Sequence, residues 1–203
     1  MISIEAINTD MKYPTFWKNV SGRRKRIYLA LFIFVIAIIA TVAGFFVPPS
    51  LKDAQIIEQQ LNQTITQGQT SGTLPLRIFV NNFGLCLLMF IPLVGAGFGI
   101  VVLFSTGQAF RAALMLQSSS ALNTATTANF TITTVILTLV LIGATFLCEY
   151  ISYSIGISES LWLFRRLLQR RWREAKVTAI LIGIVALLLT VGAIVETLAL
   201  SLV

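Results

Sequence analysis

The sequence contains no histidine, and its only aspartates are Asp10 and Asp53. Without histidine, a Ser-His or Cys-His catalytic pair and an H-E-x-x-H zinc site are excluded. Both aspartates lie outside the long apolar segments, which excludes an intramembrane protease with paired aspartates. The sequence also has neither a G-x-x-x-x-G-K-[ST] phosphate loop nor a C-x-x-C pair. We therefore expect no catalytic residue, no metal site and no cofactor, and we predict that the protein is not an enzyme.

Charged residues are scarce too: they make up 11% of the 203 residues, whereas 56% are hydrophobic. A soluble domain of this composition could not cover itself with polar surface, so we expect the chain to lie in lipid. A bilayer core is roughly 30 Å thick and takes about 20 helical residues to span. The sequence therefore predicts an all-α fold: a polytopic transmembrane helix bundle with four to five spans, one of them weak or re-entrant.

Most of the basic residues that are present form two clusters, each beside an apolar segment. The first cluster comprises Arg23, Arg24, Lys25 and Arg26. The second, which we expect to form an inner basic face, comprises Arg165, Arg166, Arg170, Arg171, Arg173 and Lys176. Nucleic-acid-binding proteins also carry basic runs, but this placement is typical of the positive-inside signals of membrane proteins. We therefore expect both clusters on the cytoplasmic side of the cell membrane, in contact with anionic lipid headgroups, and no nucleic-acid partner.

The N-terminal part divides into a tail and a membrane domain. Residues 1–26 are predicted to be a cytoplasmic basic tail, either loose or with a short amphipathic piece on the inner surface. Residues 27–203 are predicted to form a single transmembrane domain. Its first span should occupy residues 27–47, because Pro48 and Pro49 cannot continue a helix.

An external polar loop is predicted at residues 50–76, which are rich in Gln, Thr, Ser, Gly and Asn. Residues 52–61 could form a short surface helix within it. The sequon Asn62-Gln63-Thr64 predicts a glycosylation site at Asn62 if this loop is external.

The second span is predicted at residues 78–104, where the spacing of Gly95 and Gly99 lets another helix approach closely. Residues 105–125 are less apolar. If the second span ends inside and the second basic cluster is also inside, the chain between them must cross an even number of times. We therefore expect residues 105–125 to be a weak third span with Arg111 near the inner boundary; otherwise residues 129–164 must fold as a hairpin.

The apolar run at residues 129–164 would be about 50 Å long as one helix, which is more than a span needs. We expect a break at Gly143, a full span after it, and a final span from Val177 onward. Gly156 and Gly183 lie on stripes of small and polar residues in these two spans. Such stripes indicate helix packing, and we expect the two to pack together.

Three glutamates lie inside the apolar segments: Glu149, Glu159 and Glu196. A carboxylate at that depth costs roughly 2–4 kcal/mol, so each needs a partner or a role. Glu149 and Glu196 either belong to an ion, proton or partner site, or are structural acids that share hydrogen bonds with nearby polar groups. Glu159 is about one turn from the second basic cluster, and we expect it to pair there or to reach solvent.

An intramembrane polar cluster is predicted from Asn81, Asn82, Glu149 and Glu196. With a break near Gly143, Glu149 would lie near the outer end of its span, at the level of Glu196 and of the two asparagines. The amides could then donate hydrogen bonds to the carboxylates. An unbroken helix would instead move Glu149 toward the inner leaflet and leave Glu196 alone.

Three short motifs resemble the stage II sporulation protein M family of polytopic membrane proteins. They are Ile78-Phe79-Val80-Asn81-Asn82, the Glu149 helix with Ser152, Ile155 and Leu161, and Ile194-Val195-Glu196. The resemblance covers roughly residues 27–203. In that family a His-Gly pair usually stands four residues before the glutamate, whereas Thr145-Phe146 stand here, so this chain would be an outlying member without a titrating histidine.

The resemblance implies assembly with other membrane proteins, because the family's best-studied member is similar to a scaffold that holds cell-wall-cutting partners at a membrane. Our first hypothesis is therefore a noncatalytic integral membrane subunit that scaffolds or anchors partner proteins in a membrane complex. The partners expected are membrane lipids and other membrane proteins, in a hetero-complex or a homo-oligomer. The alternative is a permease-like or channel-like subunit that uses the intramembrane glutamates.

Overall fold

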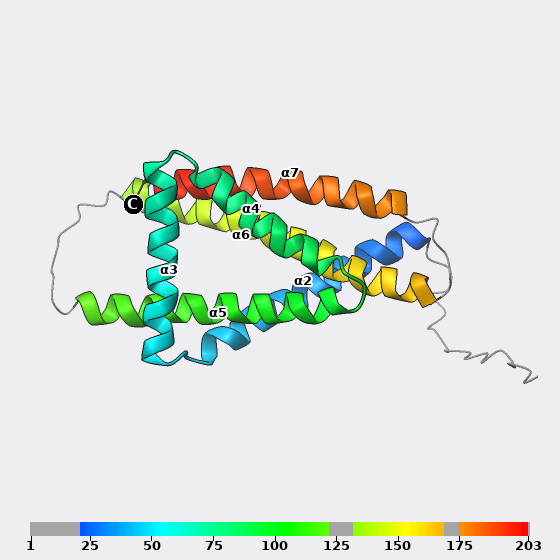
Figure 1. The fold of residues 1–203 in the computed structure, drawn as a ribbon, viewed down its shortest axis with the longest axis horizontal. Helices are drawn as coiled ribbons and strands as arrows, with labels where there is room; N and C mark the ends of the chain where they lie inside the picture. Colours follow the sequence, from blue (N-terminus) through cyan, green and yellow to red (C-terminus); the bar gives the residue numbers. More distant parts are fainter. Residues whose placement is uncertain (1–20, 122–131, 169–174, 203) are drawn as a thin grey trace, which may run out of the picture.

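The computed structural model describes residues 21–121, 132–168 and 175–202, and these form six helices (Figure 1). The helices are α2 (Gly22–Phe46), α3 (Leu51–Thr70), α4 (Leu74–Met89), α5 (Val94–Ala121), α6 (Ile132–Leu168) and α7 (Ala175–Leu200). The predicted all-α fold is confirmed, since every regular element in the described ranges is a helix. Most of the predicted tail, residues 1–20, lies outside these ranges, and residues 22–26 belong to α2.

Four helices, α2, α5, α6 and α7, are long and apolar enough to cross a membrane. The apolar helix α4 is shorter, with 16 residues. Its length is about 24 Å, somewhat less than the roughly 30 Å of a bilayer core. The predicted polytopic bundle of four to five helical spans is therefore confirmed, and α4 is its shortest candidate span.

Helix α3 lies across one end of the molecule, called the α3 end here, whereas α2, α4, α5, α6 and α7 extend along its long axis (Figure 1). At the opposite end, the start of α2 meets the end of α6 and the start of α7 (Figure 1). This basic end carries Arg26, Arg166 and Lys176. As far as the described residues extend, both basic clusters therefore lie at the same end of the bundle.

Glycines bring α2 and α5 into direct backbone contact. A Cβ atom on Gly44 would overlap the carbonyl oxygen of Phe104, and one on Gly107 would overlap that of Thr41. Neither position has room for a side chain, so the two backbones approach as closely as small-residue helix interfaces allow. This Gly44–Gly107 seam, rather than the predicted glycines, is the tightest contact between long helices.

The structure corrects the limits of the predicted second and third spans. Residues 78–104 are not one span, because α4 ends at Met89 and a turn leads into α5. Pro92 in this turn has no N–H with which to continue a helix, and Leu93 adopts a left-handed φ of 66°. The Ser160 hydroxyl of α6 holds the turn by donating to the carbonyl oxygen of Ile91 at 2.6 Å. Residues 105–121 are therefore the second half of α5, and residues 122–125 lie outside the described ranges.

Arg111 was predicted near the inner boundary, on the side of the basic clusters, whereas the structure places it away from the end that carries them. Because α5 already begins at Val94, Arg111 lies toward the α3 end. Nearby, Gln108 Nε2 donates to the carbonyl oxygen of Val47, directly after α2, at 3.4 Å. The Arg111 guanidinium lies 5.6 Å from the centre of the Phe45 ring.

The predicted break at Gly143 is wrong, since α6 is one helix of 37 residues. A glycine inside a helix costs only about 1 kcal/mol relative to alanine, which does not end a helix without a proline or a cap. The length of α6 is about 55 Å. Its Tyr150 hydroxyl is hydrogen bonded to Thr41 in the antiparallel α2. Because α2 ends at Phe46, residues 132–144 of α6 continue beyond α2 at the α3 end.

The predicted polar loop at residues 50–76 is mostly helical, and α3 is twice as long as the short helix predicted at residues 52–61. Its N-terminus is capped by Ser50, whose Oγ accepts a hydrogen bond from the backbone N–H of Asp53 at 3.2 Å. Gly72, with a φ of 65°, follows the helix and lets the chain reverse into α4.

Candidate functional site

The four residues of the predicted polar cluster lie on three neighbouring helices. Asn82 Nδ2 of α4 donates a hydrogen bond to Glu149 Oε1 of α6. Glu196 of α7 is close enough for its charge to interact with that of Glu149. Asn81 Nδ2 donates to Asn82 Oδ1 at 3.2 Å, but Asn81 is itself exposed. The structure thus brings Asn82, Glu149 and Glu196 together and places Asn81 at the edge of the group.

Glu149 keeps this position although α6 is unbroken. The surplus length of α6 extends past α2 at the α3 end, so it does not push Glu149 toward the basic end. Glu149 and Glu196 are both partly buried. The amide of Asn82 offsets part of the cost of removing the Glu149 carboxyl group from water. The carboxyl groups of this cluster can accept hydrogen bonds from a partner, but no group of three metal-ligand side chains forms among the described residues.

The small-residue stripe of α6 contacts α4 at Gly156, whereas Thr145 on the same stripe contacts α7 as predicted. A Cβ atom on Gly156 would lie 3.1 Å from the Met89 Cβ and 3.3 Å from the Cys86 carbonyl oxygen. One turn away, Cys86 Sγ donates to the carbonyl oxygen of Ser152 at 3.4 Å. Gly183 is exposed, with no described atom within 4 Å of the place its Cβ would take, so it is not a packing position among the described residues.

Helices α6 and α7 meet instead at Gly192, whose Cβ would lie 3.3 Å from the Cys148 Cβ. Thr145 Oγ1 donates to the carbonyl oxygen of Gly192 at 3.5 Å.

Gly95 and Gly99 do not form one packing surface. Gly95 lies in the first turn of α5, against the backbone of Met89, whereas Gly99 faces the side chain of Ile157 in α6. Neither site has room for a larger side chain. At Gly95 the obstacle is Met89, and at Gly99 it is Ile157. The sequence signal for the Gly44–Gly107 seam was weaker, because its two glycines lie on different helices and share no spacing motif.

At the basic end, Glu159 is 2% exposed and is paired with Arg26, whose Nη1 lies 3.4 Å from Oε1. Thr178 Oγ1 of α7 donates to the same carboxylate at 2.7 Å. Glu159 therefore pairs with a basic residue as expected, and this residue is Arg26 of the first basic cluster. Arg26 and Arg166 both lie over the Trp162 ring, at 5.2 and 5.0 Å from its centre. These contacts tie α2, α6 and α7 together.

Of the predicted inner basic face, Arg165 and Arg166 occupy the last turn of α6, where cations interact favourably with the helix dipole. Lys176 is exposed in the first turn of α7. Arg170, Arg171 and Arg173 lie outside the described residues.

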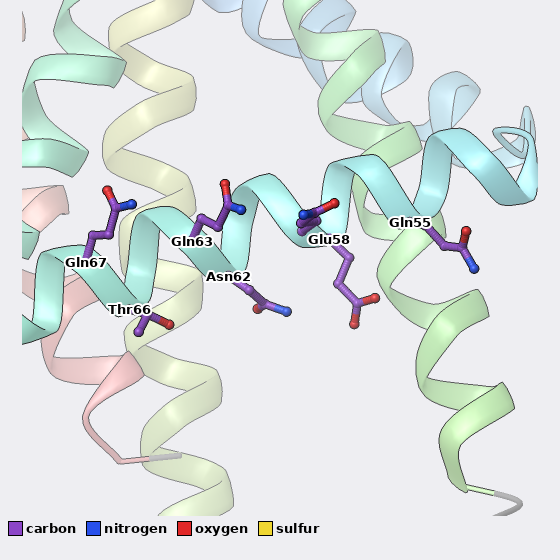
Figure 2. A pocket seen from close by; sticks show the side chains of 7 residues that line it. Gln55, Glu58, Asn62, Gln63, Thr66 and Gln67 are labelled. Carbon is purple, nitrogen blue, oxygen red and sulfur yellow. The ribbon is translucent and has the colours of Figure 1, made fainter.

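At the α3 end, one face of α3 is polar and lines a hollow of about 580 Å³ (Figure 2). Its lining residues are Gln55, Glu58, Gln59, Asn62, Gln63, Thr66 and Gln67. Asn62, the predicted glycosylation site, is exposed on this face. Helix α5 crosses α3 and continues beyond it (Figures 1 and 2).

The apolar helices and the polar groups buried between them define a multi-pass membrane protein of the helical-bundle class. Comparison with protein-family models, curated proteins and solved structures found no match. The resemblance to the stage II sporulation protein M family therefore stays a prediction, and the function must be argued from this chain's own residues.

Proposed function

We propose that this chain is a noncatalytic integral membrane subunit that anchors partner membrane proteins in the cell membrane. In this proposal the basic end faces the cytoplasm and the α3 end faces the outside, because clustered arginines and lysines beside membrane spans are retained on the inner side. The partner binds at the α3 end.

One observation carries the proposal: residues 132–144 of α6 continue for about 20 Å past the end of α2. This segment carries exposed apolar side chains, with Leu139 64% and Val140 61% exposed. The end of α5, residues 109–121, also runs past the contact between Gln108 and the chain after α2. Extended apolar surface of this kind is typical of a protein contact.

The polar face of α3 complements this apolar projection. Specific interfaces combine an apolar centre with a polar rim, and α3 lies across the base of the projecting α5 (Figure 2). The resemblance to the stage II sporulation protein M family supports the same proposal, because scaffolding is what that family implies.

Copurification tests the proposal. The tagged full chain is extracted from native membranes in a mild detergent, and its partners are identified and quantified by mass spectrometry. We expect one stoichiometric membrane protein with the unchanged chain and its loss from the double variant Leu139→Asn/Val140→Asn. The matched control is Leu168→Asn, at the other end of the same helix and 71% exposed, which should retain the partner. A chain that purifies alone, or a partner retained equally by all variants, would contradict the proposal.

A second candidate function, a permease-like or channel-like subunit, is favoured by the hydrogen bond from Asn82 to Glu149 beside Glu196. Carboxyl groups within membrane spans often mark proton or ion routes. In proteoliposomes, this candidate requires a cation-dependent flux that Glu149→Gln abolishes and Glu58→Gln, on the exposed face of α3, leaves unchanged. Absence of flux from the unchanged chain argues for the anchoring subunit.

A further inference from the structure

A groove of about 400 Å³ lies between α2, α6 and α7 at the basic end. Its apolar lining includes Ala30, Leu31, Phe34, Ile151, Ile155 and Leu181. Two arginines of the first basic cluster, Arg23 and Arg26, also line it. The volume falls within the roughly 300–1,000 Å³ of small-molecule sites.

The polar side chains in the groove form hydrogen bonds or ion pairs with other groups of this chain. Ser154 Oγ donates to the carbonyl oxygen of Tyr150 at 2.6 Å, and Ser158 Oγ donates to that of Ile155 at 2.9 Å. Glu159 is held by Arg26 and Thr178, as described above. A molecule bound in the groove would therefore contact mainly apolar side chains. Such a surface suits a hydrocarbon chain better than a polar solute.

The groove also matches one leaflet of a bilayer in length. From Arg23 to Phe34 is about 17 Å along α2, whereas half of a bilayer core is roughly 15 Å. Arg23 lines the groove and is exposed at the basic end. An acyl chain in the groove would thus place its headgroup beside this guanidinium group.

We propose that this groove binds one anionic phospholipid, with an acyl chain between α2, α6 and α7 and the headgroup phosphate beside Arg23. This lipid site is independent of the partner contact proposed at the α3 end. It requires only that the basic end lie at a membrane surface. The bound lipid would fill a groove that the three helices leave open and would stabilise their contact at the Arg26–Glu159 pair.

Native mass spectrometry of the full chain in a neutral detergent tests the site. Phosphatidylglycerol and phosphatidylcholine with identical acyl chains are titrated separately. We expect one phosphatidylglycerol to bind more tightly than phosphatidylcholine. Arg23→Gln should weaken this binding about fivefold, which is the contribution of one basic residue at an anionic lipid surface. Arg24→Gln removes the same charge from a residue that does not line the groove. This variant should bind phosphatidylglycerol as tightly as the unchanged chain does.

The apolar part is tested by filling the groove. Ala30→Phe should abolish the single tight binding event, whereas Ala43→Phe, exposed on the same helix away from the groove, should preserve it. If Ala30→Phe does not fold, Leu181→Phe fills the groove from α7 and serves instead. Equal weakening by the two arginine variants, equal affinity for both lipids, or tight binding by a folded groove-filling variant would each overturn the proposal.

Discussion

The hydroxyl of Thr41 in α2 is hydrogen bonded to the hydroxyl of Tyr150 in α6 and lies 3.1 Å from the carbonyl oxygen of Leu103 in α5. One small side chain thus links three helices that are distant in sequence. Because it has a single proton, it donates to one carbonyl oxygen at a time and can accept from the tyrosine. This link fixes the depth at which α6 passes α2, and hence how far α6 projects at the α3 end.

Replacing Thr41 by valine keeps the shape and removes this hydroxyl. We expect Thr41→Val to lower the free energy of unfolding by about 1–3 kcal/mol, since the buried Tyr150 hydroxyl loses its partner. Thermal unfolding in detergent measures the change. Thr190→Val is the control, because Thr190 is exposed and its hydroxyl bonds only within its own helix, to Ala186. Equal effects of the two variants would show that the link contributes nothing beyond a helix-surface hydroxyl.

The Gly44–Gly107 seam should be intolerant of a single methyl group. Gly107→Ala places a methyl carbon where it overlaps the backbone of Thr41 in α2. The overlap can be relieved only if α2 and α5 move apart. We expect a loss of about 1–3 kcal/mol in unfolding free energy, as for other overpacked sites. Gly97→Ala on the same helix, where no described atom lies within 4 Å of the new carbon, should be neutral or slightly stabilising. A Gly107→Ala variant as stable as Gly97→Ala would exclude the close approach of α2 and α5.

The Arg26–Glu159 pair predicts a non-additive result. Arg26→Gln or Glu159→Gln alone removes one charge and leaves the other in a mostly buried site, which typically costs about 3–5 kcal/mol. The double variant leaves no charge there and should recover much of that loss. Unfolding of the two single variants and the double variant in detergent gives the coupling energy. Strictly additive losses would mean that the two charges do not stabilise each other.

Membrane orientation can be read from cysteine labelling. A cysteine at Gln63 in α3 should react with an impermeant reagent in intact cells, because it lies at the α3 end. A cysteine at Lys176 should react only after the membrane is opened. Labelling of Lys176→Cys in intact cells, with protection of Gln63→Cys, would invert the proposed topology.

The sequence predicted the spans best where charge and proline mark their limits. Residues 27–47 were recognised because basic residues precede them and two prolines follow. The turn between α4 and α5 was missed because Pro92 stands inside an uninterrupted apolar run, with no charge to mark it. In lipid, apolarity continues through such turns, so hydropathy alone cannot locate them.

The polar cluster was predicted from the free-energy cost of placing carboxyl groups in lipid. This cost does not depend on the residues at which the helices begin and end. Asn82, Glu149 and Glu196 lie together although the break at Gly143 was wrong. Helix faces were harder to predict, as Gly156 and Gly183 show: one contacts α4 and the other contacts no described residue. In water the buried face of a helix is the apolar one, whereas in lipid both faces are apolar and the pattern loses this information.

The central claim is that residues 132–144 of α6 contact another protein. A photoreactive amino acid at Leu139, irradiated in intact cells, tests it most directly, with the same group at Leu168 on the same helix as the control. The account predicts a protein adduct of one defined mass from position 139 and none of that mass from position 168. Irradiation that gives no protein adduct at position 139, or the same adduct at both positions, would contradict it.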